Sequence, residues 1–462
     1  MKPLSRWTRL RWTCLAAALL SAAPALADPL DPNAFTSLGT LNVSSGSLTI
    51  NTSTLQMSGA ASFTGVNWPQ PSGPPIAVFV FDAINVTGGT VSIVGDRPVA
   101  LLSKGNAVVT PTLSLNATQI SGVETRPGPG GYSGGFAFGA SPAHAVPGDG
   151  PGGGVSFAGF SAGGSFGGAS GSWTSIPMIP GAAPYGGLLT TLEWGSGGGV
   201  YAPFNGGNGS GGGGGGAIEI GAVGNLTIGS VFANGFFGTG SVAGGGGAGG
   251  GILLHAGNGL IYTGSLQVPG GGATGSAGPA SGGGGGRIAL LGHPTLTLGS
   301  LAGPSVSLIG GSGSGGTSGR AGVLTVSANT TTVPAGFSAV LDGTPIVSVP
   351  GSHNQSQHTI EALIERNLTI NPGGTATLGK SHVLRTDSEL IVNGQFHTDG
   401  YSQIVEKLSG SGQVHLGHGG ELTVGATAGF ATSSFAGSLV GPGRLKKIGA
   451  GLFEVATISH TG

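Results

Sequence analysis

The chain has 462 residues, of which 100 are glycine, whereas charged residues make up 7% and aromatic residues 6%. The sequence is too hydrophobic for a charged, solvated disordered chain, and its glycines lack the G-X-Y period of collagen. The formal net charge is −1 without a basic cluster, so the electrostatic footprint of a nucleic-acid-binding protein is absent. Short runs of valine, isoleucine, leucine and threonine between glycines predict an all-β protein.

Residues 1–27 have the pattern of a secretory signal peptide. Basic residues come first, an apolar stretch runs from Cys14 to Ala23, and Ala25-Leu26-Ala27 forms an A-x-A cleavage site. The apolar stretch is too short to span a bilayer, so we expect cleavage and export. Cleavage removes four of the 16 basic residues and no acidic one, which leaves 12 − 17 = −5. Cys14 is the only cysteine, so we expect the mature chain to have neither a disulfide nor a catalytic thiol.

Residues 28–125 are predicted to form the N-terminal rungs of a β-solenoid. The segment contains stretches of period-2 alternation and continuous apolar runs, broken by glycine, proline or asparagine. The first strand of such a stack has an open edge that must be capped. The predicted core positions are Phe79, Phe81, Ile84, Val86, Val91 and Ile93.

Residues 126–216 differ from their neighbours, because glycine, proline, serine and scattered aromatic residues dominate and few runs alternate. A loop of this length counts against a simple strand assignment. We interpret it as a glycine-rich insertion that projects from the solenoid or is draped over it. Its aromatic residues would serve either as anchors on the solenoid wall or as a ligand platform. They are Tyr132, Phe136, Phe138, Phe157, Phe160, Phe166, Trp173, Tyr185, Trp194, Tyr201 and Phe204.

Residues 217–329 contain a repeat of 34 to 36 residues. A glycine tract followed by an apolar run recurs, and the runs begin at Ile218, Ile252, Ile288 and Val323. A second landmark recurs with spacings of 35 and 35 residues, at Leu226, Ile261 and Leu296. One unit cannot bury its apolar face alone, whereas a stack can, so we predict a β-solenoid and favour a right-handed parallel β-helix. The length of the unit predicts a glycine-rich excursion on one side of each rung, where glycine tolerates positive φ and close backbone approach.

Residues 330–462 are less rich in glycine and are predicted to form C-terminal β-helix rungs. Leu368, Leu390 and Val414 lie 22 and 24 residues apart, which predicts rungs without the glycine excursion. The pattern Gly443-x-Leu445-x-Lys447-x-Gly449-x-Gly451-x-Phe453-x-Val455 resembles the strand repeat of autotransporter passenger domains. Residues 408–417 resemble the rung that precedes it, and the glycine tracts ending in AIEI and RIAL are similar to those of large exported bacterial surface proteins.

This resemblance implies a secreted or surface-exposed β-helix of the pectin-lyase-like type, often an adhesin or a stalk. Such passengers continue into a translocator barrel, whereas this sequence stops at Gly462 within the motif. We therefore expect either a longer protein or another export route. The resemblance is specific for architecture and secretion and assigns no activity.

Three motifs that carry chemistry in other proteins lack the structural context which that chemistry needs. Residues 374–381 match G-x-x-x-x-G-K-[ST], but TATL within the match alternates like a strand and no helix follows to bind phosphate. Residues 159–163 and 163–167 match G-x-S-x-G without the strand and helix of a nucleophile elbow. The glycine tracts lack the aspartates of a calcium-binding roll. We therefore expect no nucleotide, no calcium and no serine nucleophile.

Two pairs of histidines occur in the C-terminal part, His353 with His358 and His415 with His418. A protein zinc site needs three or four ligands, with a carboxylate or thiolate nearby, and His415 on a strand and His418 in the following turn need not converge. We interpret these residues as surface histidines. The sequence predicts no metal and no other cofactor.

The densest group of ionisable residues offers an enzymatic alternative. Its members are Glu361, Glu365, Arg366, Arg385, Asp387 and Glu389. A lyase or glycosidase on a β-helix needs paired carboxylates, or a calcium cluster with a basic residue, on adjacent rungs. The 22-residue spacing would stack residues 365–366 on residues 387–388, although the same geometry gives an ordinary salt-bridged ladder of little energetic value. The candidate catalytic residues are Glu365, Arg385, Asp387 and Glu389.

The sequence therefore predicts a non-enzymatic, adhesin-like or structural protein that is secreted or exposed on the outer surface of a bacterial cell. Its expected partners are host or environmental glycans or surface proteins. We expect no nucleic acid, and membrane association only through an anchor or barrel that this sequence does not contain. The alternative is a polysaccharide lyase or glycosidase on the same scaffold. A purely structural spacer would bind neither cells nor glycans.

Overall fold

The computed structural model describes residues 29–460 apart from 72, 122, 138–143, 158, 174–179, 189–190, 203–206, 276–277, 294–295, 298–305, 334, 337, 342–358, 385 and 426–431. The predicted signal peptide, Arg385, His353 and His358 lie outside the described residues. Within them the protein is all-β, as predicted, and its one helical element is the 3-10 turn η1 (Pro32–Ala34). The described residues include no helix that is long and apolar enough to cross a membrane.

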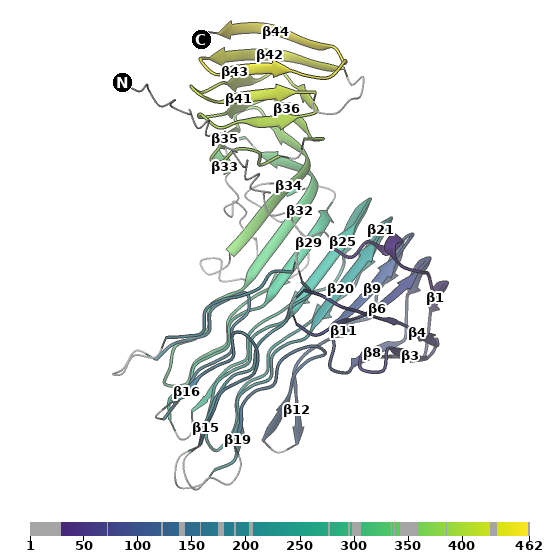
Figure 1. Ribbon diagram of the computed structural model, residues 1–462, viewed down its shortest axis with the longest axis vertical. Coiled ribbons are helices and arrows are strands. Elements are labelled where there is room, and N and C mark those ends of the chain that lie inside the picture. The colour runs from purple at the N-terminus through teal and green to yellow at the C-terminus, as the bar shows by residue number, and fades with distance from the viewer. Residues whose placement is uncertain are drawn as a thin grey trace, which may run out of the picture.

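An eleven-stranded sheet runs through most of the molecule (Figure 1), and all its pairs except β5–β6 are parallel. In spatial order its strands are β5 (Val66–Trp68), β6 (Ile76–Phe81), β9 (Val99–Ser103), β20 (Ala217–Ala222), β25 (Gly251–Ala256), β29 (Arg287–His293), β32 (Val323–Val333), β34 (Thr359–Ile370), β36 (Glu389–Val392) and β39 (Lys407–Ser409), with β30 (Leu296–Thr297) also paired to β32. Strands β6, β9 and β20 are buried along their whole length, as expected for parallel strands that are covered on both faces.

Two shorter parallel sheets continue each unit, because the chain passes from the long sheet to each of them in turn. The first contains β1 (Thr40–Val43), β7 (Ala83–Val86), β10 (Ala107–Val109), β21 (Asn225–Ile228) and β26 (Gly259–Tyr262). The second contains β11 (Leu113–Ser114), β22 (Val231–Phe232), β27 (Leu266–Gln267) and β31 (Val306–Ser307). The main hydrophobic core draws side chains from all three sheets.

The N-terminal end of the stack is covered by antiparallel strands. Strand β5 pairs antiparallel with β6. Beside it, β2 pairs antiparallel with β3 and parallel with β8, in a sheet of β4 (Phe63–Thr64), β3 (Gln56–Gly59), β2 (Ser47–Asn51) and β8 (Thr90–Val94). Of the predicted core residues, Phe79, Phe81, Ile84, Val86 and Ile93 are buried and Val91 packs against them, which confirms that prediction.

The pairing register confirms the long repeat and corrects one of its positions. Ile218 pairs with Ile252, and Ile252 pairs with Ile288. Ile288, however, pairs with Leu324, and Val323 lies one residue out of line. The true spacings are therefore 34, 36 and 36 residues. A shift of one residue moves a side chain to the opposite face of the sheet, and it is Leu324 that joins the main core.

The second landmark of the repeat is corrected in the same way. Leu226 pairs with Leu260 and not with Ile261. Leu260 is buried in the core, whereas Ile261 is 57% exposed on the outer face. Because both residues are aliphatic, the sequence pattern alone did not distinguish the two alignments.

The C-terminal part continues the long sheet with the shorter spacing that was predicted, since Leu368 pairs with Leu390. Leu390 then pairs with Leu408. The prediction that Val414 follows Leu390 was wrong, because Val414 pairs with Phe396 in another sheet. That sheet contains β33 (Ser338–Leu341), β35 (Thr375–Leu378), β37 (Gln395–His397), β40 (Gln413–His415), β42 (Ser433–Gly441) and β44 (Phe453–His460), and a third contains β38 (Gln403–Val405), β41 (Glu421–Val424) and β43 (Arg444–Lys447).

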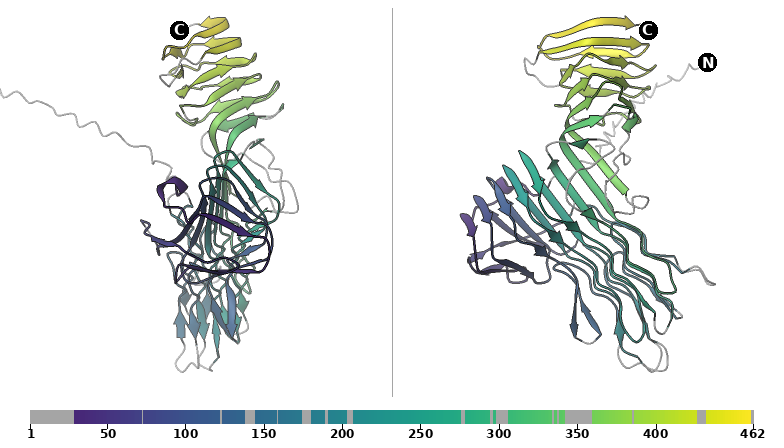
Figure 2. Two further views of the ribbon diagram at one scale, coloured as in Figure 1. Left: turned by 90° about the vertical axis from the view of Figure 1, so that its right-hand side faces the viewer. Right: turned by 180° about the vertical axis from the view of Figure 1, so that it is seen from behind.

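The glycine-rich excursions project from one side of the stack, opposite the C-terminal end of the molecule (Figure 2). Their hydrogen bonds have a period of three, which is clearest in residues 245–250. The amides of Gly245 and Ala248 donate to the carbonyls of residues 199 and 196, those of 246 and 249 donate to 281 and 284, and those of 247 and 250 donate to 236 and 233. Three residues per turn is the geometry of a polyproline II helix. Each tract is therefore a polyproline-II-like strand that is hydrogen-bonded to three neighbours, and we call the whole layer the glycine array.

Glycine is required in the array because the backbones of neighbouring tracts lie so close together that no space remains for a Cβ atom. A Cβ at Gly250 would lie 1.9 Å from the carbonyl oxygen of Gly216, and a Cβ at Gly246 would lie 1.8 Å from that of Gly271. Neither glycine has the positive φ that a turn would require. Of the two reasons predicted for glycine in the excursions, close approach therefore applies within the tracts.

Residues 126–216 contribute tracts to the same array. The amide of Gly164 donates to Gly246, and the amide of Gly284 donates to Gly164, so this segment lies between two tracts of the repeat. The interpretation of these residues as a loop projecting from or draped over the stack is therefore replaced by one in which they are interleaved with the repeat. Their ends form short antiparallel sheets: β12 (Thr118–Ser121) with β13 (Glu124–Arg126); β14 (Phe136–Ala137), β19 (Gly209–Ser210) and β23 (Thr239–Gly240); β15 (His144–Val146), β18 (Val200–Ala202), β24 (Ala243–Gly244) and β28 (Thr274–Gly275); and β16 (Ser156–Phe157) with β17 (Phe160–Ser161).

Candidate binding surface

Two of the four sequence-predicted catalytic residues, Asp387 and Glu389, have described side chains. In register with Glu389 lie Asn367 on one side and Lys407 on the other. The Glu389 carboxylate accepts a hydrogen bond from Ser409 Oγ at 2.9 Å. Asp387 is exposed in the turn before β36. The side chain of Glu365 and all of Arg385 lie outside the described residues, so the catalytic assignment stays a prediction.

The motif matches lie in structures that do not support their usual chemistry. Residues 375–378 of the nucleotide-binding pattern form strand β35. In the two G-x-S-x-G matches, Ser161 and Ser165 are buried, and their hydroxyls donate to the carbonyls of Ala243 and Ala183 at 2.8 and 2.6 Å. Both hydroxyls therefore cross-link the backbone of the glycine array instead of facing a substrate.

Two histidines do stack in the C-terminal part, although they are not the predicted pair. His415 stacks on His397 with ring centroids 4.3 Å apart and an interplanar angle of 6°, because the two occupy equivalent positions in β40 and β37. Burial and the neighbouring His397 lower the pKa of His415, and Asp399 opposes the shift. The recurring Gln-x-His pattern was the available sequence signal. Among the described residues, no group of three or more histidine, cysteine, aspartate or glutamate side chains could hold a metal ion.

Several aromatic residues of segment 126–216 are anchors on the outer face of the long sheet. Trp194 and Phe166 are buried there. The Tyr185 hydroxyl donates to the carbonyl of Trp194 at 2.6 Å. The Arg287 guanidinium lies 5.5 Å from the Phe166 ring centroid and donates to the Tyr185 carbonyl at 3.0 Å. Trp194 and Phe166 form a second core cluster with residues of the sheet, and Tyr185 packs against this cluster. The sheet residues include Val78, Val80, Ala100, Leu102, Leu253 and Ala289.

Other apolar residues are exposed at the far end of the glycine array, near the short strands β14, β16 and β23. Phe136, Phe157 and Phe237 are 42%, 60% and 47% exposed, and Val155 is 48% exposed. We call these four side chains the distal surface. Figure 1 places β15, β16 and β19 at the end of the array that is remote from the long parallel sheet. Phe138 and Phe204, which were also predicted candidates, lie outside the described residues.

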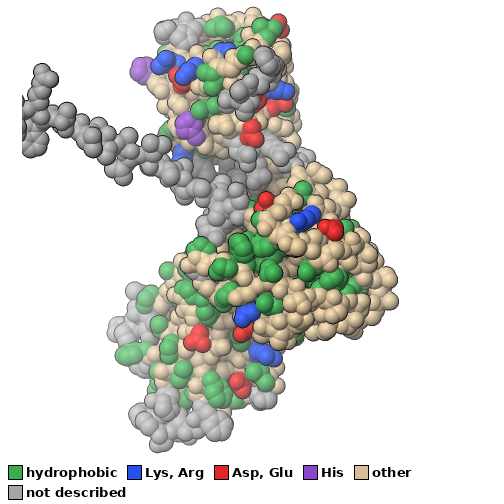
Figure 3. Space-filling view, turned by 45° about the vertical axis from the view of Figure 1, so that its right-hand side comes forward, with side chains coloured by type: hydrophobic (Ala, Val, Ile, Leu, Met, Phe, Trp, Pro, Cys, Tyr) green, Lys and Arg blue, Asp and Glu red, His purple; other side chains and the backbone are tan. Residues whose placement is uncertain are grey.

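The region around the distal surface is almost uncharged. Between residues 132 and 217 the only charged residues are Asp149 and Glu193. Figure 3 shows many apolar side chains across the lower part of the molecule, with acidic and basic side chains scattered singly among them. Such a surface is suited to a neutral or apolar partner, because a strongly charged partner would gain little electrostatic attraction.

No family model, characterised protein or solved structure matches this chain. The resemblance to autotransporter passengers therefore stays a prediction that rests on the sequence motif. The candidate binding surface rests on the exposure and position of the residues that form it.

Proposed function

We propose that the chain is a β-solenoid, in its favoured form a right-handed parallel β-helix, from which the glycine array projects. The order in which the chain visits the three parallel sheets supports this proposal, since β20, β21 and β22 are followed by β25, β26 and β27 in matching register. Each unit then contacts mainly its neighbours, and stability is approximately a sum over units and interfaces.

We further propose that the protein acts outside the cell as a non-enzymatic, adhesin-like binding protein. The observation that carries this proposal is the set of exposed phenylalanine side chains at the far end of a hydrogen-bonded array. Exposed apolar groups that cluster on a soluble domain commonly mark interaction sites. Aromatic side chains also provide contact area at low cost in conformational entropy. The array would hold these side chains away from the rest of the molecule.

The chemistry of the surface favours glycans as partners over charged macromolecules. Sugar rings present apolar C–H faces that stack on aromatic rings, and no charge is needed for that contact. An apolar protein surface is the second partner class that this composition fits. Nucleic acid is disfavoured, because Lys and Arg residues are absent between residues 132 and 217.

The test is a binding assay on whole cells and on a glycan panel. The double variant Phe157→Ser with Phe237→Ser removes two apolar side chains of the distal surface. We expect it to lower the affinity about tenfold or more, as hot-spot aromatic residues do. The matched control is Ile261→Ser, because Ile261 is similarly exposed but lies in strand β26, outside the glycine array. Equal affinities for wild type and the double variant would disprove the assignment of the distal surface.

The enzymatic alternative can be tested in parallel on a panel of polysaccharides. If wild type cleaves a substrate and Asp387→Ala abolishes turnover without unfolding, the protein is an enzyme and the proposal fails. If neither protein cleaves any substrate, the enzymatic alternative is rejected.

A further inference from the structure

We propose that a cavity on the outer face of the long sheet binds a small amphipathic cation, a primary ammonium group on a short apolar stem. This inference does not depend on the proposed function at the distal surface. The cavity has a volume of about 90 Å³ and lies over β6, β20 and β25. Three parts of the chain that are distant in sequence border it: residues 29–30, residues 68–71, and the residues Leu188, Thr191 and Leu192.

Most of the residues that line the cavity are apolar. Ile76 and Leu253 line it from the sheet, Leu192 lines it from the segment after Tyr185, and Trp68 lines it from the end of β5. None of the lining residues is a lysine or an arginine. A cavity built from converging apolar segments with a few polar groups is the usual form of a small-molecule site.

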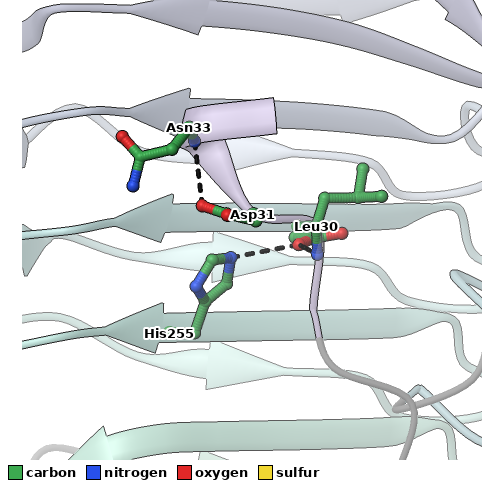
Figure 4. A network of polar contacts seen from close by, with 5 residues as sticks. Leu30, Asp31, Asn33 and His255 are labelled. Carbon is green, nitrogen blue, oxygen red and sulfur yellow. Dashed lines mark hydrogen bonds and ion pairs between the residues drawn. The ribbon is translucent and has the colours of Figure 1, made fainter. Parts of the chain in front are cut away.

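The polar residues that line the cavity are Gln70, Thr191 and Glu219, of which only Glu219 is charged. Glu219 is only 2% exposed. Its Oε1 atom accepts a hydrogen bond from the amide of Leu30 at 2.8 Å and lies 3.0 Å from His255 Nε2. Figure 4 shows Leu30 and His255 approaching this atom from two sides, with the Asp31–Asn33 cap of η1 beside them. The second oxygen, Oε2, has no hydrogen-bond partner among the described residues. This atom is not one of the fully enclosed side-chain atoms that lack a partner, so it keeps some accessible surface through which a ligand can reach it.

The backbone fixes this arrangement through a glycine. His255 pairs in register with Gly221, two residues beyond Glu219. A Cβ at Gly221 would lie 2.0 Å from His255 Nε2, so the imidazole ring occupies the space that a side chain would fill. Only glycine at this position lets His255 reach back to Glu219. The site therefore depends on Gly221, His255 and Leu30 to hold one oxygen of Glu219 and leave the other for a ligand.

The chemistry of the cavity selects among ligand classes. An anion would be repelled by the buried carboxylate. A neutral apolar molecule would fill the volume but leave Oε2 without a partner. A primary ammonium on an apolar stem donates a charge-assisted hydrogen bond to Oε2 while its stem packs against Leu192 and Leu253. The Trp68 ring at the cavity wall also favours a cation.

The experiment compares n-butylammonium, 1-butanol and butyrate on the full chain at constant ionic strength. Binding is followed by calorimetry and by tryptophan fluorescence, to which Trp68 at the cavity wall contributes. We expect saturable binding of n-butylammonium and at least about tenfold weaker binding of the other two, because only the ammonium group pairs with Glu219. Butanol or butyrate binding as tightly as n-butylammonium would overturn the proposal, as would no saturable response to n-butylammonium at any soluble concentration.

Variants then locate the site. Glu219→Gln keeps the shape of the side chain and removes its charge, so we expect n-butylammonium affinity to fall at least about tenfold. The matched control is Glu421→Gln. Glu421 lies in β41, in the C-terminal part of the chain, where it forms an ion pair with Arg444 at 3.7 Å, so this substitution should not affect binding. Unchanged affinity in a folded Glu219→Gln protein would contradict the proposal. If that variant does not fold, the three-ligand series on the unaltered protein still decides the question.

Discussion

Glycine serves two purposes in this chain, and the array separates them at single residues. Gly159, in the turn between β16 and β17, has φ +95°, and an added Cβ there would meet no atom within 4 Å. Gly247, within a tract, has no positive φ, but a Cβ there would lie 2.1 Å from the carbonyl oxygen of Gly213. Gly187 has neither constraint, because an added Cβ would meet no atom within 4 Å. The three positions should therefore respond differently to alanine.

We expect Gly247→Ala to destabilise the protein by about 2 to 4 kcal/mol, since two hydrogen-bonded backbones must move apart to admit the methyl group. Gly187→Ala is the matched control and should change the free energy of unfolding by less than about 0.5 kcal/mol. Urea denaturation of both variants measures the difference. Equal effects of the two substitutions would show that the array is not packed as tightly as described.

The stacked histidines make a prediction about pH. The pKa of His415 is lowered in the folded state, mainly by burial and then by His397. Below the ordinary histidine pKa of about 6.5, the unfolded chain therefore binds more protons than the folded chain. The contribution of His415 to stability is complete above that pH and decreases as the pH falls toward its lowered folded-state pKa. We expect His415→Gln to reduce the loss of Tm between about pH 7.5 and pH 5, whereas His418→Gln, which changes an exposed histidine, should leave the loss unchanged. An identical loss of Tm in all three proteins would contradict the assignment.

Among the larger elements, segment 126–216 connects the array to the outer face of the long sheet. Trp194 is its largest buried side chain, and it packs on the sheet in the second core cluster. We expect Trp194→Ala to cost about 3 to 5 kcal/mol, as large-to-small changes of buried aromatic residues do. Phe157→Ala, an exposed aromatic residue in the same segment, should cost less than about 0.5 kcal/mol. Chemical denaturation distinguishes the two, and a small effect of Trp194→Ala would mean that the segment is not anchored there.

The elements themselves were largely predictable from the sequence, because alternation and glycine tracts are local signals. The core positions of β6, β7 and β8 and the 35-residue units followed from them. Pairing register was less accessible, since neighbouring aliphatic residues such as Leu260 and Ile261 fit either alignment. The interleaving of tract 162–168 between repeat tracts was not predictable, because one glycine amide resembles another in sequence and the choice of neighbour is nonlocal.

The polar contacts at the cavity could not be predicted from the sequence either, because they too are nonlocal. Glu219 and His255 lie 36 residues apart, and Glu219 and Leu30 lie 189 residues apart. No local pattern connects them. A correct register would have shown that His255 lies opposite Gly221 of the neighbouring strand. The contact between His255 and Glu219 would still not follow, because it requires the imidazole ring to reach back two residues along that strand. Phe136 and Phe157 were among the predicted candidates, and only their exposure separates them from the buried anchors. Phe237 lies outside the segment for which candidates were predicted and was missed.

At the scale of the whole molecule, the proposed function requires export. The distal surface can meet glycans of a cell surface or of the environment only if the chain leaves the cytoplasm. The sequence pattern of residues 1–27 predicts that it does, and it predicts the bond that is cut. The most direct measurement is N-terminal sequencing of the native protein together with its location in fractionated cells. A chain that begins at Asp28 and is found in the medium or at the outer surface is the predicted result. A chain that retains residues 1–27 and remains in the cytoplasm would contradict the proposed function.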